Sequence, residues 1–209
     1  MKRLKSNPLK EQNERVVYGL IYYFLISFGF KIFYGFIADS RSLMVCGIFS
    51  LFGILIAVVT LTRLGKGSVC KSFIDRKIQK IFMFGMVIII LVSTAMLFLS
   101  VSHMVFFHTL FPPQLIASWI AVMAAAGSLG FMEWMGTQAG NVPELEEDII
   151  FVLQTDFMFS ILVVTAIVSS RMGIYILDPA CAIFISFLII FYSVRFFIQH
   201  FIKGVFDEL

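Results

Sequence analysis

The residue best suited to do chemistry is Asp156, a carboxylate inside an otherwise apolar stretch of the chain. Gln154, Thr155 and Ser160 add polar groups around it, and Asp156 and Ser160 share a helix face because they are four residues apart. A carboxylate in hydrocarbon is costly, so it usually faces protein or water and often marks an ion path. The pattern indicates a transport or gating role for Asp156, with a structural role as the open alternative.

Three other charged residues in apolar stretches have simpler interpretations. Asp178, followed by Pro179, is typical of a helix start, since proline suits the first turn and aspartate suits the N-terminal end of the helix dipole. Glu133 is expected to reach water near an interface. Lys31 is expected to extend its ammonium toward an interface, as long basic side chains do near the ends of membrane helices.

Composition places these residues in a membrane. The 209-residue chain is 60% hydrophobic and only 14% charged, which is too little charge to cover a soluble domain of this length. A bilayer core needs about 20 apolar residues per helix. Six apolar runs meet that length, at residues 16–37, 43–62, 81–101, 115–135, 149–169 and 176–198. The predicted fold class is therefore an all-α membrane protein with six transmembrane helices.

The basic residues predict the orientation of these helices. All but Lys31, Arg41 and Arg171 of the 16 lysines and arginines fall on one side of the predicted bundle. The positive-inside rule makes that side cytoplasmic and places both termini there. Residues 1–15 are then a cytoplasmic segment, residues 16–209 form the six-helix domain, and no C-terminal cytoplasmic domain is expected. The protein is expected to be an integral, multi-pass component of a plasma or inner membrane.

Several function classes find no support in the sequence. The three cysteines lie far apart without a paired spacing, so neither a disulfide framework nor a zinc knuckle is predicted. A nucleophile–base arrangement, a phosphate loop and a redox motif are all missing, so the chain is not expected to be an enzyme. The basic residues between 63 and 80 are expected to set topology and contact lipid, not nucleic acid. His103 and His108 are read as interfacial histidines, with a metal entry site as the other interpretation.

Residues 154–209 resemble the last two transmembrane helices of the cation diffusion facilitator family. That family has an aspartate early in the fifth helix, a serine four residues on, a glycine-containing turn, and an Asp-Pro pair that opens the sixth helix. Asp156, Ser160, Gly173 and Asp178-Pro179 match this order.

Residues 31–55 resemble the first turn and second helix of the same family. Lys31, Ser42 and the run 47–51 fit, whereas Cys46 stands where the family has an aspartate. The resemblance covers most of the chain in topology, and its motifs are most specific in the second, fifth and sixth helices.

The metal site implied by this resemblance is degenerate. The family takes two ligands, four residues apart, from the second helix and two from the fifth. The matching positions here are Phe49, Gly53, Val152 and Asp156. Only the last can bind a metal. Cys46 and Ser50, also four apart, offer a substitute face, because cysteine is a good ligand for zinc or copper, although a serine hydroxyl is a poor one. The expected metal ligands are therefore Asp156, Cys46 and Ser50.

The resemblance implies a divalent cation efflux transporter that is coupled to protons and works by alternating access. Its cargo would be zinc, iron, manganese or cobalt, and no tightly bound cofactor is expected. A homodimer is also implied by resemblance alone. The loss of three ligand positions keeps an alternative open, namely a non-transporting relative that serves as a membrane scaffold or partner subunit. An unrelated six-helix channel is a weaker third possibility, since neither filter-like repeats nor a charged ring is visible.

Overall fold

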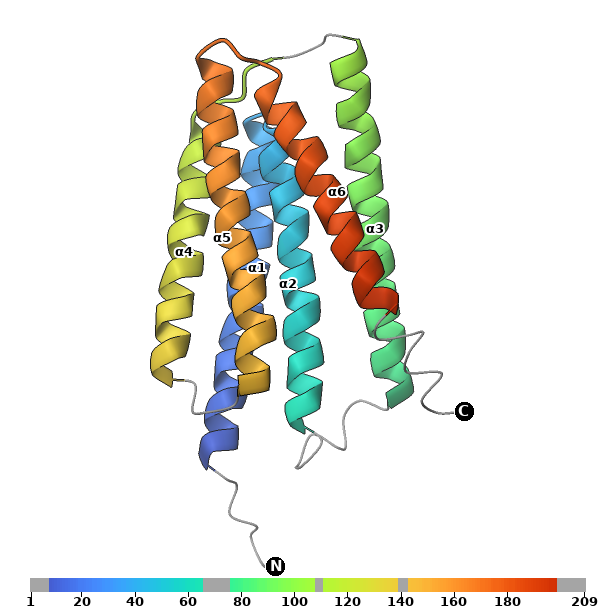
Figure 1. Ribbon diagram of the computed structural model, residues 1–209, viewed down its shortest axis with the longest axis vertical. Coiled ribbons are helices and arrows are strands. Elements are labelled where there is room, and N and C mark those ends of the chain that lie inside the picture. Colours follow the sequence, from blue (N-terminus) through green and yellow to red (C-terminus); the bar gives the residue numbers. More distant parts are fainter. Residues whose placement is uncertain (1–7, 66–75, 108–110, 139–142, 199–209) are drawn as a thin grey trace, which may run out of the picture.

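The computed structural model describes residues 8–65, 76–107, 111–138 and 143–198. Within these segments the fold is all-helical, and the helices run as an up-and-down bundle (Figure 1). The six helices are α1 (Pro8–Ile37), α2 (Arg41–Gly65), α3 (Arg76–Phe106), α4 (Ile116–Gln138), α5 (Pro143–Arg171) and α6 (Leu177–Phe197).

Each helix contains a stretch long and apolar enough to cross a membrane. These stretches are Glu14–Ile37, Arg41–Thr62, Ile81–Phe106, Ile116–Thr137, Glu147–Arg171 and Leu177–Phe197. The shortest has 21 residues, which at 1.5 Å per residue is roughly 32 Å, the thickness of a hydrocarbon core. Within the described residues the six predicted spans are therefore six helices long and apolar enough to cross a membrane, as an integral multi-pass membrane protein requires.

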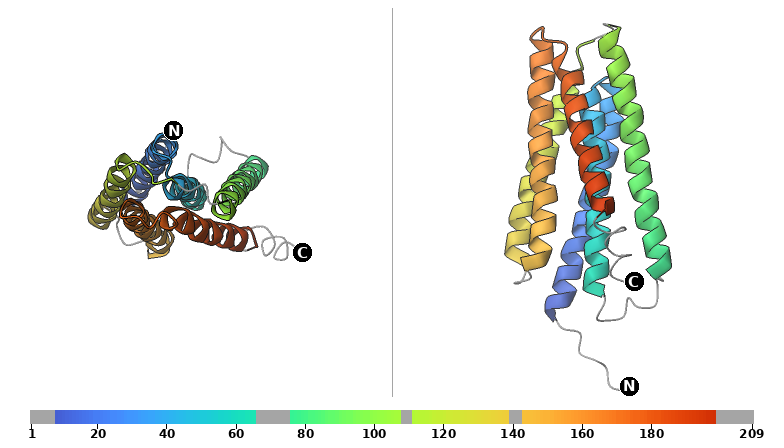
Figure 2. Two further views of the ribbon diagram at one scale, coloured as in Figure 1. Left: turned by 90° about the horizontal axis from the view of Figure 1, so that it is seen from above. Right: turned by 45° about the vertical axis from the view of Figure 1, so that its right-hand side comes forward.

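α2 is the central helix. In its most apolar stretch 78% of the residues are buried, compared with 22% in α3. α2 packs against α1, α3, α5 and α6, while α4 packs against α1 and α5. Viewed along the bundle, α1, α2, α4 and α5 form a compact group, and α6 crosses from α5 and α2 to α3 (Figure 2). The interior of the bundle therefore lies between α1, α2, α4 and α5.

Two tight turns fix the upper end of the bundle in Figure 1. The turn between α1 and α2 puts Asp39 in the left-handed region with φ 54°, a conformation that aspartate tolerates better than most residues. The turn after α5 uses Gly173 with φ 102°, and the Ile174 backbone N–H donates to the Ser169 carbonyl at 3.2 Å. The Gln114 N–H donates to the Ala38 carbonyl at 2.8 Å and ties the start of α4 to the first turn.

Candidate cation site around Asp156

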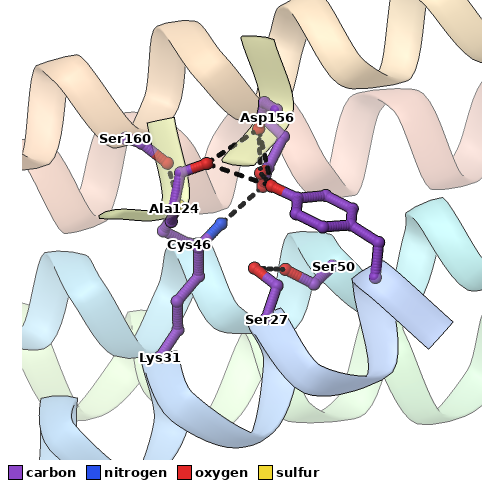
Figure 3. A network of polar contacts seen from close by, with 9 residues as sticks. Ser27, Lys31, Cys46, Ser50, Ala124, Asp156 and Ser160 are labelled. Carbon is purple, nitrogen blue, oxygen red and sulfur yellow. Dashed lines mark hydrogen bonds and ion pairs between the residues drawn. The ribbon is translucent and has the colours of Figure 1, made fainter. Parts of the chain in front are cut away.

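Asp156 lies in the interior, nine residues into the 25-residue span of α5. One carboxylate oxygen, Oδ1, accepts from Lys31 Nζ of α1 at 2.6 Å. The other, Oδ2, lies 2.9 Å from the Ser128 hydroxyl of α4 and 3.2 Å from the Tyr23 hydroxyl of α1. Asp156 and Lys31 are both fully buried. Figure 3 shows the lysine reaching across from α1 to the carboxylate. Three helices thus meet at one acid.

The two hydroxyl groups at Asp156 share a pair of acceptors. The Tyr23 hydroxyl is 3.0 Å and the Ser128 hydroxyl 3.1 Å from the Ala124 carbonyl, and the two hydroxyl oxygens are 2.7 Å apart. Each hydroxyl has one proton to donate. Whichever donates to the carboxylate, the other can donate to the carbonyl, so both acceptors are satisfied.

The polar groups of α1 and α2 follow a four-residue spacing that puts them on the facing sides of the two helices. On α1 these are Tyr23, Ser27 and Lys31, and on α2 they are Ser42, Cys46 and Ser50. Residues at i, i+4 and i+8 share one helix face. The Ser50 hydroxyl donates to the Ser27 hydroxyl at 3.4 Å, so the two rows meet (Figure 3). The sequence therefore builds a polar seam inside an apolar bundle.

Two glycines make room for the side chains at this seam. A Cβ atom on Gly47 of α2 would lie 3.1 Å from Lys31 Cβ, and one on Gly127 of α4 would lie 2.9 Å from a ring carbon of Tyr23. Contacts this short force the neighbour to shift. The lysine stem and the tyrosine ring therefore lie against helix surfaces without side chains, which holds Nζ and the phenol oxygen at Asp156.

The ion pair balances its charge within the bundle. A lone carboxylate in a low-dielectric interior is strongly disfavoured, and so is a lone ammonium. Among the residues whose side chains the structure describes, Lys31 is the one buried lysine or arginine. The pair is neutral overall, and its carboxylate accepts from one ammonium and from one of the two hydroxyl groups beside it. This is the arrangement in which a buried charge becomes tolerable.

The expectation that Lys31 extends toward an interface is wrong. The side chain is fully buried and points to Asp156. The physical reason is the acid 125 residues further along the chain, which offers the ammonium a charge-assisted hydrogen bond in place of water. The local rule for lysines near helix ends does not include a partner on another helix. The sequence does contain a signal for this pairing, because one predicted span holds a lysine and another holds a central aspartate of opposite charge.

The three predicted metal ligands have different partners in the structure. Asp156 bonds Lys31, Ser128 and Tyr23, as described. The Cys46 thiol lies 3.9 Å from the Ser160 hydroxyl of α5, and Ser50 bonds Ser27. Figure 3 draws all three in one interior region, joined by no hydrogen bond to one another. In the described segments there is no group of three or more His, Cys, Asp or Glu residues placed to hold a metal. A site of Asp156, Cys46 and Ser50 stays a prediction.

The positions that correspond to the family's ligands are filled by packing. The Phe49 and Val152 side chains are buried, and the Phe49 ring meets the Phe159 ring edge-on at 4.9 Å between centroids. A Cβ atom on Gly53 would lie 2.6 Å from the Phe24 ring. These residues face the interior, as metal ligands would. Phe49 and Val152 fill space there, and Gly53 lets the Phe24 ring lie directly against the α2 backbone.

Asp178 is placed in the first turn of α6, as predicted, and its carboxylate has a further role. Oδ1 accepts from the hydroxyls of Ser40, at 3.0 Å, and Ser42, and Oδ2 accepts from the Arg41 backbone N–H at 2.9 Å. The Asp178 N–H donates to the Ser170 hydroxyl at 3.2 Å. The carboxylate therefore caps the start of α2, a neighbouring helix, whereas the Asp-Pro pattern predicts that it acts at the start of its own helix.

The remaining candidate residues lie away from the seam. Glu133 is exposed near the end of α4, and its contact with water stays a prediction. The His103 ring contacts the Phe107 ring at the end of α3, with centroids 4.3 Å apart and the ring planes tilted by 42°. His108 lies outside the described residues, so the metal entry site suggested for the two histidines stays a prediction.

No protein-family model matches this chain, and no curated protein matches it either. The resemblance to the cation diffusion facilitators therefore stays a hypothesis based on the motifs quoted above.

Proposed function

We propose that the protein is a membrane transporter that exports a divalent cation from the cytoplasm in exchange for protons. The observation that carries this proposal is the fully buried Asp156 carboxylate near the middle of its span, with partners on α1 and α4. Acids at this depth are rare because they are expensive, and those present typically mark an ion path. The resemblance to cation diffusion facilitators supports the same function, with zinc, iron, manganese or cobalt as the candidate cargo.

The seam offers the chemical groups that such a cargo needs. Asp156 supplies a carboxylate, and Cys46 lies close to the Lys31 ammonium on the neighbouring face of α2 (Figure 3). Carboxylate oxygen atoms and thiolate sulfur atoms both bind divalent metals. A metal binds the deprotonated form of such ligands, and Asp156 is already ionised in its pair with Lys31, so metal entry would release the proton of the Cys46 thiol. Exchange of a cation for protons follows from this linkage.

The Lys31–Asp156 contact lies between the parts of the bundle that would have to move relative to each other during alternating access. It joins the α1–α2 hairpin to the α4–α5 hairpin, and relative motion of the two hairpins would open the seam to one side or the other. The upper end in Figure 1 is tied by short turns and by Asp178. In the proposed cycle, this end is closed while the opposite end admits the cargo.

The proposed orientation places both termini in the cytoplasm. α1 begins and α6 ends at the lower end of the bundle in Figure 1, which is also where α3 and α5 begin. The positive-inside rule makes that end cytoplasmic. Labelling a cysteine introduced at Asp39, with Cys70 replaced by serine, tests this. A membrane-impermeant maleimide is expected to react from the outer face, and reaction only after permeabilisation would reverse the orientation.

A second candidate function is a non-transporting scaffold or partner subunit. The observation that favours it is that protein groups already satisfy Asp156: an ammonium neutralises its charge and two hydroxyls occupy its second oxygen. A pair of this kind can hold helices in register without binding any ion. On this reading the seam sets helix order, and the bundle presents its outer faces to other membrane proteins.

Flux measurements in proteoliposomes distinguish the two functions. Zinc, iron, manganese and cobalt uptake would be followed under a proton gradient for the wild type, Asp156→Ala and Thr155→Ala. Thr155 is a matched control because it precedes Asp156 on the same helix, is only half-buried, and donates its hydroxyl proton to the Phe151 carbonyl of its own helix at 2.8 Å. We expect cation flux in the wild type and the control, and its loss in Asp156→Ala.

The other outcomes of this experiment are equally informative. Flux that persists in Asp156→Ala would keep transport and remove Asp156 from the path. Absence of flux for all four cations, from wild-type protein shown to be folded and inserted, would reject transport and support the scaffold function.

A further inference from the structure

We propose that Lys31 is a built-in competitor for cations at Asp156, so that it determines which cations the site admits. Its ammonium occupies the position that a bound cation would take at Oδ1. Only a cation that binds the carboxylate better than the tethered ammonium can enter. This role rests on the cation-transport function proposed above and specifies its selectivity.

The first support for this role is that the Lys31 ammonium already occupies the cation position beside Asp156. The 2.6 Å separation of Nζ and Oδ1 is that of a charge-assisted hydrogen bond. Neither side chain has any exposed surface. The titratable groups that surround the ammonium are Asp156 on α5, Cys46 on α2 and Tyr23 on α1, and α4 contributes the Ser128 hydroxyl to the same carboxylate. With Lys31 in place, the formal charge of the pair is zero.

The second support is the way the lysine is tethered. Its Cβ lies over Gly47, so the stem is held between α1 and α2 and the ammonium stays beside the acid. A tethered group competes at an effective concentration set by its attachment, not by the solution. A monovalent ion brings the same single charge and must also lose its water. A divalent ion must lose more tightly held water, but it brings twice the charge to the same carboxylate, so its Coulomb attraction is about doubled.

This argument predicts selectivity for divalent over monovalent cations, and it predicts how that selectivity is lost. Without the ammonium, Asp156 becomes an acid with two hydroxyl partners and no counter-charge. Such a site should take a small monovalent cation such as sodium. A purely structural ion pair predicts otherwise: its loss would destabilise the bundle, and sodium would not restore it specifically.

The first experiment measures thermal unfolding of the full-length protein in nanodiscs at mildly alkaline pH. Sodium chloride is titrated against choline chloride at constant ionic strength for the wild type, Lys31→Met and Lys31→Met/Asp156→Asn. We expect sodium to raise the Tm of Lys31→Met by at least about 2 °C, and to leave the wild type and the double variant unchanged. A Lys31→Met protein that is folded and insensitive to sodium would overturn the proposal.

The second experiment keeps the ion pair and therefore does not depend on the folding of Lys31→Met. Cobalt binding is measured for the wild type and Lys31→Arg. A guanidinium can hold the carboxylate through two parallel hydrogen bonds, so it should be harder to displace. We expect cobalt affinity to fall at least about tenfold, which corresponds to about 1.4 kcal/mol. Equal affinity in the two proteins would overturn the proposal.

The two experiments also separate this proposal from the proposed function. Suppose that the wild type binds cobalt, that Lys31→Arg binds it equally well, and that the Tm of Lys31→Met does not respond to sodium. Cation transport would then still stand, and Lys31 would be rejected as a competitor. Absence of cobalt binding to the wild type, together with sodium-insensitive Lys31→Met, would reject the cation site at Asp156 and the competitor with it.

Discussion

The Asp178 carboxylate lies 2.9 Å from the backbone nitrogen of Arg41, so a residue in the first turn of α6 caps the first turn of α2. The backbone N–H groups at a helix start have no partner within their own helix. Around this helix start Ser40, Ser42 and Asp178 are buried, and a carboxylate from a neighbouring helix takes the place of water for one of these groups. Since Ser170 of α5 accepts from the Asp178 N–H, three helices are joined at this residue.

Replacing Asp178 should therefore destabilise the bundle. Asp178→Ala removes the acceptor for the Arg41 N–H and for the hydroxyls of Ser40 and Ser42. We expect a loss of about 2–3 kcal/mol in the free energy of unfolding, measured by denaturant titration in mixed micelles. Asp39→Asn is the control: Asp39 is exposed and forms a surface ion pair with the Arg41 side chain at 3.2 Å, so the cost should be below about 1 kcal/mol. Equal effects would refute the cap.

The ion pair should behave as a coupled unit. Lys31→Met leaves a buried carboxylate without its counter-charge, and Asp156→Asn leaves a buried ammonium, so each should cost about 3–5 kcal/mol. The double variant Lys31→Met/Asp156→Asn removes both charges and should be more stable than either single variant. A double-mutant cycle on unfolding free energies measures this coupling. Additive losses would show that the two residues do not depend on each other.

The shared hydroxyls predict a different pattern of coupling. Tyr23→Phe or Ser128→Ala alone leaves one donor for two acceptors, the Asp156 carboxylate and the Ala124 carbonyl. Each should cost about 0.5–2 kcal/mol. The double variant removes both donors and strips Oδ2 of its partners, so its cost should exceed the sum of the two. If the costs of the two single variants add up to the cost of the double variant, the two hydroxyls act separately.

Gly127 should be sensitive to the addition of a single methyl group. A Cβ atom there would lie 2.9 Å from the Tyr23 ring, so Gly127→Ala must displace that ring from Asp156. We expect a cost of about 1–3 kcal/mol, together with a change in tyrosine fluorescence. Gly130, one turn further along α4, has open space around its Cβ position. Gly130→Ala should be neutral or slightly stabilising, since alanine favours a helix more than glycine does. Similar costs for both would contradict the close contact.

The parts of the fold that depend on local pattern could be predicted from the sequence. Six apolar runs predict six helices because the requirement for a bilayer span acts on about 20 consecutive residues. The interior position of Asp156 follows in the same way, from the cost of facing lipid. Asp178-Pro179 is recognisable as a helix start because its signal lies within one turn.

The partners of these residues could not be predicted by the same reasoning. Asp156 meets a lysine 125 residues away, and Asp178 meets a backbone group 137 residues away. Such pairings depend on which helices are neighbours, and the hydrophobic period of a single helix does not contain that information. Lys31 was assigned to an interface because the local rule for lysine considers only its own helix. Pairing unlike charges across different spans would have left Glu133, Asp156 and Asp178 as candidates, of which Asp156 is the most central.

The distance along the chain between Lys31 and Asp156 also has a consequence for biogenesis. Ribosomes add about 5–20 residues per second, so Asp156 is added roughly 6–25 seconds after Lys31. During that interval α1 has to enter the bilayer with a charge that its final partner cannot yet neutralise. The ammonium must then reach toward the lipid headgroups, and it can withdraw only when α5 inserts. The side chain would thus cross part of the membrane during assembly, and closure of the ion pair would mark the arrival of the fifth helix.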